Sequence, residues 1–370
     1  MEISRKLLFL ILNLDGGGSE KIFTRLVSNL CHIHDIIVVT FYEQGVFLSE
    51  IKELPVSYYS ISANNDNTLR FALRLRKIVK QERPEMVISF LYYPNIISFL
   101  ALIGLRIKHI PSERSNHRMY MTRSLKHIIW KDMIRHAYQK SVKIITLTDR
   151  VKNFIIEDFR ISEKKIDVIH NGLNFDVIGK LADEDMQGAV FDTRNKNIVA
   201  VGRFTEAKNY PMLIEAFDIL HSKHPETRLH IIGAGELMEK IKKLIKLKNL
   251  ESEINLTGFI KNPYPYIKKA DCYVMSSKWE GFPNALVEAM FINGHVVSTD
   301  CPTGPADIIK HEHDGLLSAN DDAEKLAENL ERILYDNDLR QKLYSNSRIS
   351  IQRFDEKTMI DKYRRIIEEN

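Results

Sequence analysis

Cysteine is scarce in this chain of 370 residues, and the three that occur, Cys31, Cys272 and Cys301, lie far apart. They are odd in number and form no Cys-x-x-Cys pair, which argues against a disulfide framework and against a cysteine-based zinc site. We therefore expect a protein that works in a reducing compartment, the cytoplasm.

Long apolar segments are also rare. The run from Leu7 to Leu12 is too short for the core of a secretory signal, and Asp15 follows it closely. Residues 86–105 carry no charge, but the polar and proline-containing stretch 92–95 interrupts them. We interpret this segment as a strand at 86–90, a loop, and a buried helix from about Asn95. A membrane-spanning helix is the alternative.

The chain has no strong excess of one charge, since 53 Lys and Arg residues face 49 Asp and Glu residues, a net charge of +4. The distribution is uneven: residues 1–170 hold 26 basic and 17 acidic residues, and the remainder holds 27 and 32. The N-terminal half is therefore the candidate for meeting an anionic surface or acceptor. Solvated lysines on exposed faces are the simpler alternative, and we predict no nucleic-acid partner.

Basic and apolar residues are mixed between residues 106 and 126. This mixture suits a lipid headgroup or the diphosphate of a lipid carrier. We hypothesise that a membrane-bound acceptor docks here and that the protein lies peripherally at the inner face of the plasma membrane. A non-catalytic lipid-binding module would explain this segment alone. The residues concerned are Arg106, Lys108, Arg114, Arg118, Arg123 and Lys126, with Met119, Tyr120 and Met121 between them.

Short apolar runs alternate with helical spacings along both halves of the chain. Runs such as 6–13 and 197–201 are typical of buried parallel strands. A chain of 43.0 kDa exceeds what one core usually supports. We therefore predict an α/β protein with two doubly wound domains, at residues 1–175 and 190–350, joined through the polar stretch 180–196. Residues 354–370 are predicted to hold a last amphipathic helix.

Two predicted strands lead into loops suited to phosphate. Gly16 and Gly17 follow the first strand and precede a helical pattern, although the dinucleotide-binding pattern G-x-G-x-x-G is not met. Glycine lets backbone amides approach a phosphate closely. Gly202, Arg203 and Lys208 follow the strand at 197–201. Two cations five residues apart can converge on one diphosphate, and two solvated loop charges are the alternative.

The stretch 276–292 combines a strand end, a Gly-Phe-Pro turn and a helix start. We expect the helix to begin at Pro283 or Asn284, so that the amides of 284–286 face the strand end and attract a phosphate. Glu280 lies in the turn and Glu288 lies in the helix. The helix start and the two carboxylates can together hold a sugar nucleotide, unless both glutamates are merely solvated.

The motif E-G-F-P-N-A-L-V-E-A-M, from Glu280 to Met290 and with Glu288 as its second glutamate, resembles the paired-glutamate signature of the retaining GT-B glycosyltransferases of family 4. The segment that begins at Gly202 resembles that family's G-R-x-x-x-x-K-N element. The resemblance implies two Rossmann-like domains that face each other across a cleft, with the last helix packed back on the first domain. It is specific mainly between Gly202 and Asp307.

The resemblance also implies roles for single residues. Glu288 would hold the ribose hydroxyls of the donor nucleotide, and Glu280 would contact the donor sugar. Arg203 and Lys208 would bind the donor diphosphate and stabilise the leaving group. The remaining donor-binding candidates are Gly16, Gly17, Gly202, Phe259, Ile260, Phe282, Asn284, Ala285 and Leu286. Arg114, which stands where many members carry a histidine, joins His117 and Arg118 as candidates for contact with the acceptor or the donor sugar.

The predicted reaction is transfer of a hexose or N-acetylhexosamine from a nucleotide-diphosphate sugar, with UDP favoured, to a hydroxyl of a lipid-linked or oligosaccharide acceptor. The resemblance implies retention of the anomeric configuration and assembly of a surface polysaccharide or glycan. We expect no metal or other cofactor, because no Asp-x-Asp follows a predicted strand. A non-hydrolysing sugar-nucleotide epimerase and an NAD-binding oxidoreductase are the alternatives, and the latter leaves the charged candidates without a common task.

Overall fold

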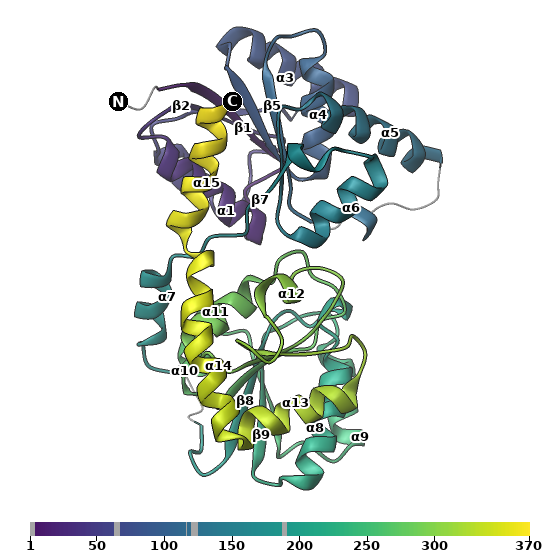
Figure 1. Ribbon diagram of the computed structural model, residues 1–370, viewed down its shortest axis with the longest axis vertical. Coiled ribbons are helices and arrows are strands. Elements are labelled where there is room, and N and C mark those ends of the chain that lie inside the picture. The colour runs from purple at the N-terminus through teal and green to yellow at the C-terminus, as the bar shows by residue number, and fades with distance from the viewer. Residues whose placement is uncertain (1–3, 63–66, 116, 120–124, 187–190) are drawn as a thin grey trace. The chain divides into compact units, whose positions relative to one another are not determined.

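The computed structural model describes residues 4–62, 67–115, 117–119, 125–186 and 191–370. The chain divides into two compact units, residues 1–172 with 357–370, and residues 173–356. Each unit is a parallel sheet with helices on both faces (Figure 1). The chain first leaves the first unit between Gly172 and Leu173, earlier than the predicted boundary in the polar stretch 180–196. The reason is helix α7 (Phe175–Ala182), whose Phe175 stacks on Phe291 of the second unit.

The sheet of the first unit has seven parallel strands among the residues described, in the order β3-β2-β1-β4-β5-β6-β7. The order reverses between β1 and β4, and doubly wound sheets bind ligands at the carboxyl ends of strands at this point. The strands are β1 (Lys6–Ile11), β2 (Asp35–Thr40), β3 (Ser57–Ser60), β4 (Met86–Phe90), β5 (Lys108–Glu113), β6 (Ile144–Thr146) and β7 (Ile166–Val168).

Helices from both ends of the chain cover one face of this sheet. The last helix places Met359, Tyr363 and Ile367 in the same apolar cluster as Phe23 of the first helix. The helical segments are α1 (Gly18–Leu30), α2 (Leu48–Glu53), α3 (Thr68–Glu82), α4 (Tyr92–Leu102), η1 (His117–Met119), α5 (Leu125–Lys140), α6 (Asp149–Phe159), η2 (Glu163–Lys165) and α15 (Glu356–Glu369).

The uncharged segment 86–105 forms strand β4 and helix α4, with one difference from the prediction. Helix α4 begins at Tyr92, three residues before the predicted start. Pro94 lies in the first turn of the helix, where its missing amide hydrogen costs nothing, so it does not interrupt the helix. Among the residues described, no helix is long and apolar enough to cross a membrane.

The sheet of the second unit has six parallel strands in the described part of the chain, in the order β10-β9-β8-β11-β12-β13. Its order reverses between β8 and β11. Both units thus confirm the predicted class, an α/β protein with two doubly wound domains. The strands are β8 (Lys196–Val201), β9 (Thr227–Ile232), β10 (Ile254–Gly258), β11 (Cys272–Met275), β12 (Val296–Thr299) and β13 (Leu316–Ser318).

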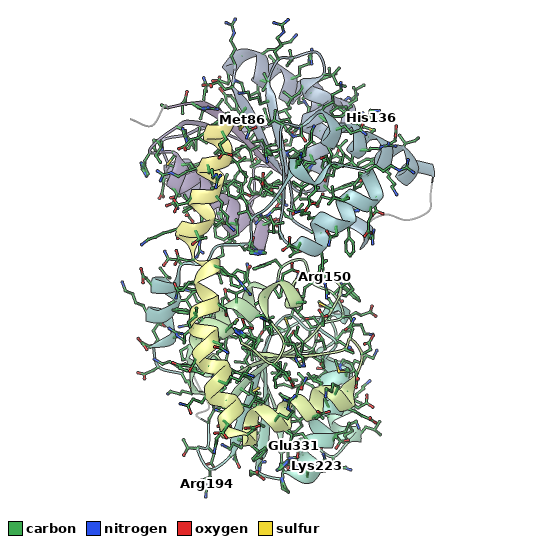
Figure 2. All side chains as sticks on the ribbon, in the orientation of Figure 1. Met86, His136, Arg150, Arg194, Lys223 and Glu331 are labelled. Carbon is green, nitrogen blue, oxygen red and sulfur yellow. The ribbon has the colours of Figure 1, made fainter. Side chains whose placement is uncertain are left out.

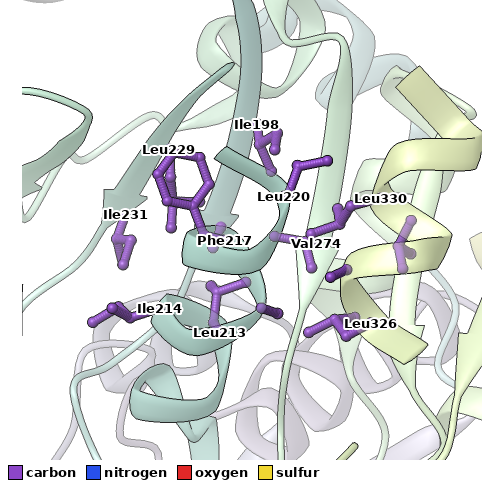
Figure 3. Close-up of a cluster of buried hydrophobic side chains, with 14 of the residues drawn as sticks. Ile198, Leu213, Ile214, Phe217, Leu220, Leu229, Ile231, Val274, Leu326 and Leu330 are labelled. Carbon is purple, nitrogen blue, oxygen red and sulfur yellow. The ribbon is translucent and has the colours of Figure 1, made fainter. Parts of the chain in front are cut away.

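A large apolar core holds one helical layer of this unit to its sheet. Phe217 and Leu220 of α8 meet Leu326 and Leu330 of α13 over the buried strand residue Val274 (Figure 3). The remaining helical segments are η3 (Glu206–Lys208), α8 (Tyr210–Lys223), α9 (Met238–Leu247), α10 (Tyr264–Lys269), α11 (Asn284–Ile292), α12 (Pro305–Ile308), α13 (Ala323–Tyr335), α14 (Asn337–Ser350) and η4 (Ile351–Phe354).

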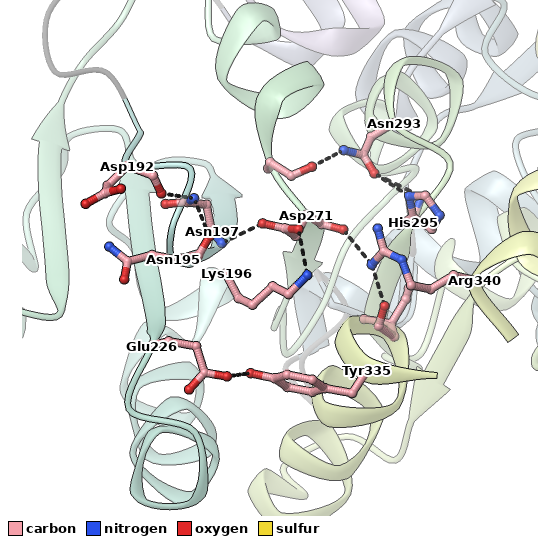
Figure 4. A network of polar contacts seen from close by, with 12 residues as sticks. Asp192, Asn195, Lys196, Asn197, Glu226, Asp271, Asn293, His295, Tyr335 and Arg340 are labelled. Atoms are coloured by element: carbon pink, nitrogen blue, oxygen red, sulfur yellow. Dashed lines mark hydrogen bonds and ion pairs between the residues drawn. The ribbon is translucent and has the colours of Figure 1, made fainter. Parts of the chain in front are cut away.

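A polar network joins the amino ends of the strands in the second unit (Figure 4). Asp271, just before β11, has a carboxylate that accepts a hydrogen bond from the backbone amide of Asn197 at 2.9 Å and one from the Lys196 ammonium at 3.5 Å. Arg340 of α14 donates to the Asp271 carbonyl at 3.1 Å. The pairing of Lys223 with Glu331 (Figure 2) is more exposed and stabilises little. This network lies at the edge of the sheet opposite to the carboxyl ends of the strands (Figure 4).

Candidate functional site

The loop after β8 brings two cations, Arg203 and Lys208, to the carboxyl end of the sheet. The two side chains differ in their exposure and in their contacts. Arg203 is exposed, and its side chain makes no hydrogen bond or ion pair with any residue that the structure describes. Lys208 is half-buried at the end of η3. A Cβ on Gly202 would lie 3.0 Å from Lys208 Cε and from the Tyr210 hydroxyl oxygen. A glycine at 202 therefore lets the Lys208 side chain cross the strand end.

Lys208 meets Glu280 across the point where the strand order reverses. The Lys208 Nζ lies 2.5 Å from Glu280 Oε1, and the two side chains are 21% and 14% exposed. The Ser277 hydroxyl donates to the same Oε1 at 2.6 Å. Glu280 follows β11 and Lys208 follows β8, so the fold brings together two predicted site residues that lie 72 positions apart.

Helix α11 begins at Asn284, as predicted, and its start faces the same edge of the sheet. Glu288 lies half-buried in its second turn. The pKa of the Tyr273 hydroxyl lies well above its usual value. Burial is the largest cause, and the charges of Glu288 and Glu280 also contribute. The two glutamates therefore lie near the same buried tyrosine, the second residue of β11.

Phe282 and Phe259 have opposite surroundings, although both were predicted to meet the nucleotide. Phe282 is buried, and its ring packs edge-on against Phe354 at 5.7 Å, which gives it a packing role. Phe259 follows β10 and is 77% exposed, so it remains accessible to a ligand, and Ile260 beside it is half-buried. The Phe259 side chain is therefore not part of the hydrophobic core.

The glycine loop of the first unit lies between β1 and α1. Gly17 is the N-cap of α1 and supplies no side chain to cap it. A Cβ on Gly17 would lie 2.2 Å from Glu20 Oε2, so the Glu20 carboxylate covers the helix start. Burial raises the pKa of Glu20. Gly16 is exposed, and a Cβ added to it would lie 3.8 Å from Val46 Cγ2.

The three candidates after β5 lie in two separate contact networks. Arg114 is 3% exposed, donates to Asn171 Oδ1 and the Tyr363 hydroxyl, and lies over the Phe90 ring. His117 is 1% exposed and so does not lie on the surface. Its Nε2 lies 2.8 Å from Asp158 Oδ2, and burial lowers its pKa.

Arg118 shares the partner Asp158 with His117 and has a second acidic partner, Glu157. It pairs with Asp158 and Glu157, both at 2.7 Å. Its charge is therefore largely compensated within the first unit, which weakens the case for Arg118 in a membrane contact. Arg123 of the same predicted basic segment lies outside the described residues.

Two kinds of residue at these strand ends were not singled out from the sequence. The Ser277 hydroxyl donates to the Glu280 carboxylate, and the Thr303 hydroxyl donates to the backbone carbonyl of Glu280. Glu113 is fully buried and accepts a hydrogen bond from Tyr138 at 2.8 Å. The small hydroxyl residues that end the apolar run before Lys278 were the available signal, but a strand-end hydroxyl alone does not identify its acceptor. In the parts of the chain described, no group of three acidic, histidine or cysteine side chains could hold a metal ion.

Two family models together match most of the chain. The model described as Glycosyltransferase Family 4 matches residues 16–177, and the model described as Glycosyl transferases group 1 matches residues 182–350. The family 4 match contains the glycine loop, and the group 1 match contains the sheet edge that carries Arg203 and Glu280.

Two curated relatives from Campylobacter jejuni align with nearly the whole chain. One, an N-acetylgalactosamine-N,N'-diacetylbacillosaminyl-diphospho-undecaprenol 4-alpha-N-acetylgalactosaminyltransferase, is 28% identical over 95% of this chain and 96% of its own. The other transfers N-acetyl-D-galactosamine, by its name, to GalNAc-alpha-(1->4)-GalNAc-alpha-(1->3)-diNAcBac-PP-undecaprenol. It is 28% identical over 98% of both chains.

Solved structures share the fold at low identity. HepE from Anabaena in complex with UDP superposes with a TM-score of 0.83 at 16% identity, covering 99% of this chain and 100% of HepE. A glycosyltransferase from Rickettsia africae gives a TM-score of 0.82 at 19% identity, covering 99% and 98% of the two chains. These likenesses confirm the predicted fold class, two Rossmann-like domains of the GT-B type.

Proposed function

The chain belongs to the GT-B glycosyltransferases of group 1 and family 4, and from this premise we propose that it transfers a sugar from a UDP-sugar to a lipid-linked glycan. The transferred sugar is a hexose or an N-acetylhexosamine. The Campylobacter relatives are named for N-acetylgalactosamine transfer onto undecaprenol-linked acceptors, which makes UDP-N-acetylgalactosamine the first donor to test. The placement of Lys208 and Glu280 at the sheet's reversal point is the observation that carries the proposal.

The donor diphosphate binds between the loop after β8 and the start of α11 in this proposal. Arg203 supplies a guanidinium that has no competing partner among the described residues. The amides at the start of α11 add donors for phosphate oxygens. Glu288 accepts the ribose hydroxyls, and the exposed Phe259 with Ile260 lies beside the base. The proposal needs no metal, because the positive charges of Arg203 and Lys208 balance the charge of the diphosphate.

The reaction breaks the bond between the anomeric carbon and the β-phosphate oxygen, and it forms a bond to the acceptor hydroxyl oxygen. The electron pair of the broken bond leaves on the β-phosphate, where Lys208 and Arg203 stabilise the developing charge. The acceptor proton passes to the departing phosphate, since the proposal assigns no carboxylate as a base. The anomeric configuration is retained.

Lys208 changes partner during this cycle. In the free site its ammonium lies 2.5 Å from Glu280. A diphosphate carries more negative charge than one carboxylate, so the bound donor draws Lys208 toward it. Glu280 is then released to contact the donor sugar.

Calorimetric titration with UDP, GDP and NAD tests the proposal on the wild type, Arg203→Ala and Glu288→Ala. We expect UDP to bind, and each substitution to weaken binding by about tenfold or more, because each removes a charged hydrogen bond. Lys240→Ala, an exposed cation on α9, is the matched control and should bind as the wild type does. Binding of NAD alone, or UDP binding indifferent to both substitutions, would contradict the proposal. Product analysis with donor alone identifies an epimerase.

A further inference from the structure

Buried hydroxyl groups hold three loops together at the carboxyl edge of the second unit. Ser276 donates to the Lys208 carbonyl at 2.8 Å and so joins the loop after β11 to the loop after β8. Thr299, at the end of β12, donates to the Ser277 carbonyl at 2.7 Å. Thr303 donates to the Glu280 carbonyl. The three donor residues, Ser276, Thr299 and Thr303, are at most 2% exposed, so water does not compete for these bonds.

The Glu280 carboxylate is held through one of its two oxygens. Oε1 accepts from the Lys208 ammonium at 2.5 Å and from the Ser277 hydroxyl at 2.6 Å. Oε2 accepts no hydrogen bond from the described residues. This arrangement fixes the plane of the carboxylate and leaves one oxygen for a ligand.

The two donors on Oε1 respond differently to a bound diphosphate. The charged Lys208 is attracted to it and can leave, whereas the neutral Ser277 hydroxyl is not. Ser277 also cannot move far, because Thr299 holds its carbonyl and the residue is fully buried. When Lys208 has moved to the donor, Ser277 is therefore the side chain that still holds Glu280.

We propose that Ser277 is a positioning residue, which keeps Glu280 aimed at the donor sugar while Lys208 serves the diphosphate. Thr303 assists by holding the backbone carbonyl of Glu280. The proposal rests on the proposed function and adds a specific expectation. Loss of the Ser277 hydroxyl impairs turnover rather than donor binding, because its effect is largest once Lys208 has been drawn away.

A double-mutant cycle between Ser277→Ala and Glu280→Ala tests this proposal. The probe is UDP-N-acetylgalactosamine with a synthetic undecaprenyl-diphosphate-linked N-acetylhexosamine as acceptor, and the readout is release of UDP. We expect Ser277→Ala to lower kcat by about tenfold and to change the donor KM by less than about threefold. In the Glu280→Ala background the same change should alter kcat by less than about twofold.

Two further variants separate positioning from damage to the fold. Thr303→Val removes the hydroxyl on the Glu280 carbonyl at nearly constant volume, and its effect on kcat should also vanish without the Glu280 carboxylate. Ser298→Ala is the matched control, because Ser298 is fully buried and donates to the Thr299 carbonyl without touching Glu280. It should leave kcat within about twofold of wild type, and a larger drop would show that loss of any buried hydroxyl in this sheet is damaging.

The possible failures are distinguishable. If the wild type neither binds UDP nor releases it from the donor, the proposed function is wrong and this inference falls with it. If the wild type turns over but Ser277→Ala lowers kcat equally with and without the Glu280 carboxylate, only the inference is overturned. Unchanged kcat in Ser277→Ala would overturn it as well.

Discussion

Glu113 is a fully buried carboxyl at the end of β5, beside the buried Arg114. Burial raises its pKa to about 7, although hydrogen bonds from Tyr138 and Ser115 act in the opposite direction. An unfolded chain would release this proton near pH 4.5. The folded protein therefore binds one more proton than the unfolded chain between these two pH values.

This proton makes stability fall as pH rises through the window from about 4.5 to about 7. Below the window the protonated carboxyl is compatible with burial, and above it the folded state must bury a charge. Glu113→Gln should remove this dependence. Between pH 4.5 and pH 8, the free energy of unfolding of the variant should therefore rise by roughly 3 kcal/mol relative to that of the wild type. Urea unfolding at both pH values measures it. Glu251→Gln, an exposed change, should show no such gain.

At the scale of elements, two glycines of the second unit have different structural roles. Gly202 directly follows β8, where a Cβ would press on Lys208 and Tyr210. Gly179 lies inside helix α7, where an added Cβ would meet Phe291 only at 4.0 Å. The first glycine leaves room for a site side chain, whereas the second only lowers helix propensity.

Alanine at these two positions should therefore have opposite effects. Gly202→Ala should displace Lys208 and lower kcat by about tenfold or more, with UDP release as the measurement. Gly179→Ala should leave kcat unchanged and raise the free energy of unfolding by about 0.5–1 kcal/mol, as urea titration would show. If Gly202→Ala kept full activity, the proposed role of Lys208 at the strand end would lose its support.

At the scale of the whole molecule, the excess of basic residues lies in the first 170 residues. Arg118 is paired with two carboxylates, but Arg106, between α4 and β5, and Lys108, the first residue of β5, are exposed. We propose that these two residues contribute to peripheral contact with an anionic membrane, where a membrane-bound acceptor would be found.

Reversing both charges, Arg106→Glu with Lys108→Glu, should weaken binding to phosphatidylglycerol vesicles by at least about tenfold at low salt. Vesicle pelleting measures the bound fraction, and added salt should reduce binding of the wild type too. The control reverses Lys243 and Lys246, exposed on α9 of the second unit, with the same change in net charge. Equal losses for both pairs would mean that only net charge matters.

Local patterns along the chain determined much of this protein. Apolar runs and helical spacings predicted the strands β1, β4 and β8 and the fold class, because burial against a sheet imposes its period on nearby residues. The candidate site residues Arg203, Lys208, Glu280 and Glu288 could also be chosen from the sequence, since they lie in two short contiguous segments.

Only the tertiary structure decided how those halves meet. The pairing of Lys208 with Glu280, the hydroxyls that hold it, and the packing of Phe282 on Phe354 all join residues that the sequence alone does not pair. The burial of His117 and the early crossing after Gly172 likewise depend on elements distant in sequence. A pattern of residue types states what a segment tends to form, but which partner satisfies a polar group depends on the packing of other segments.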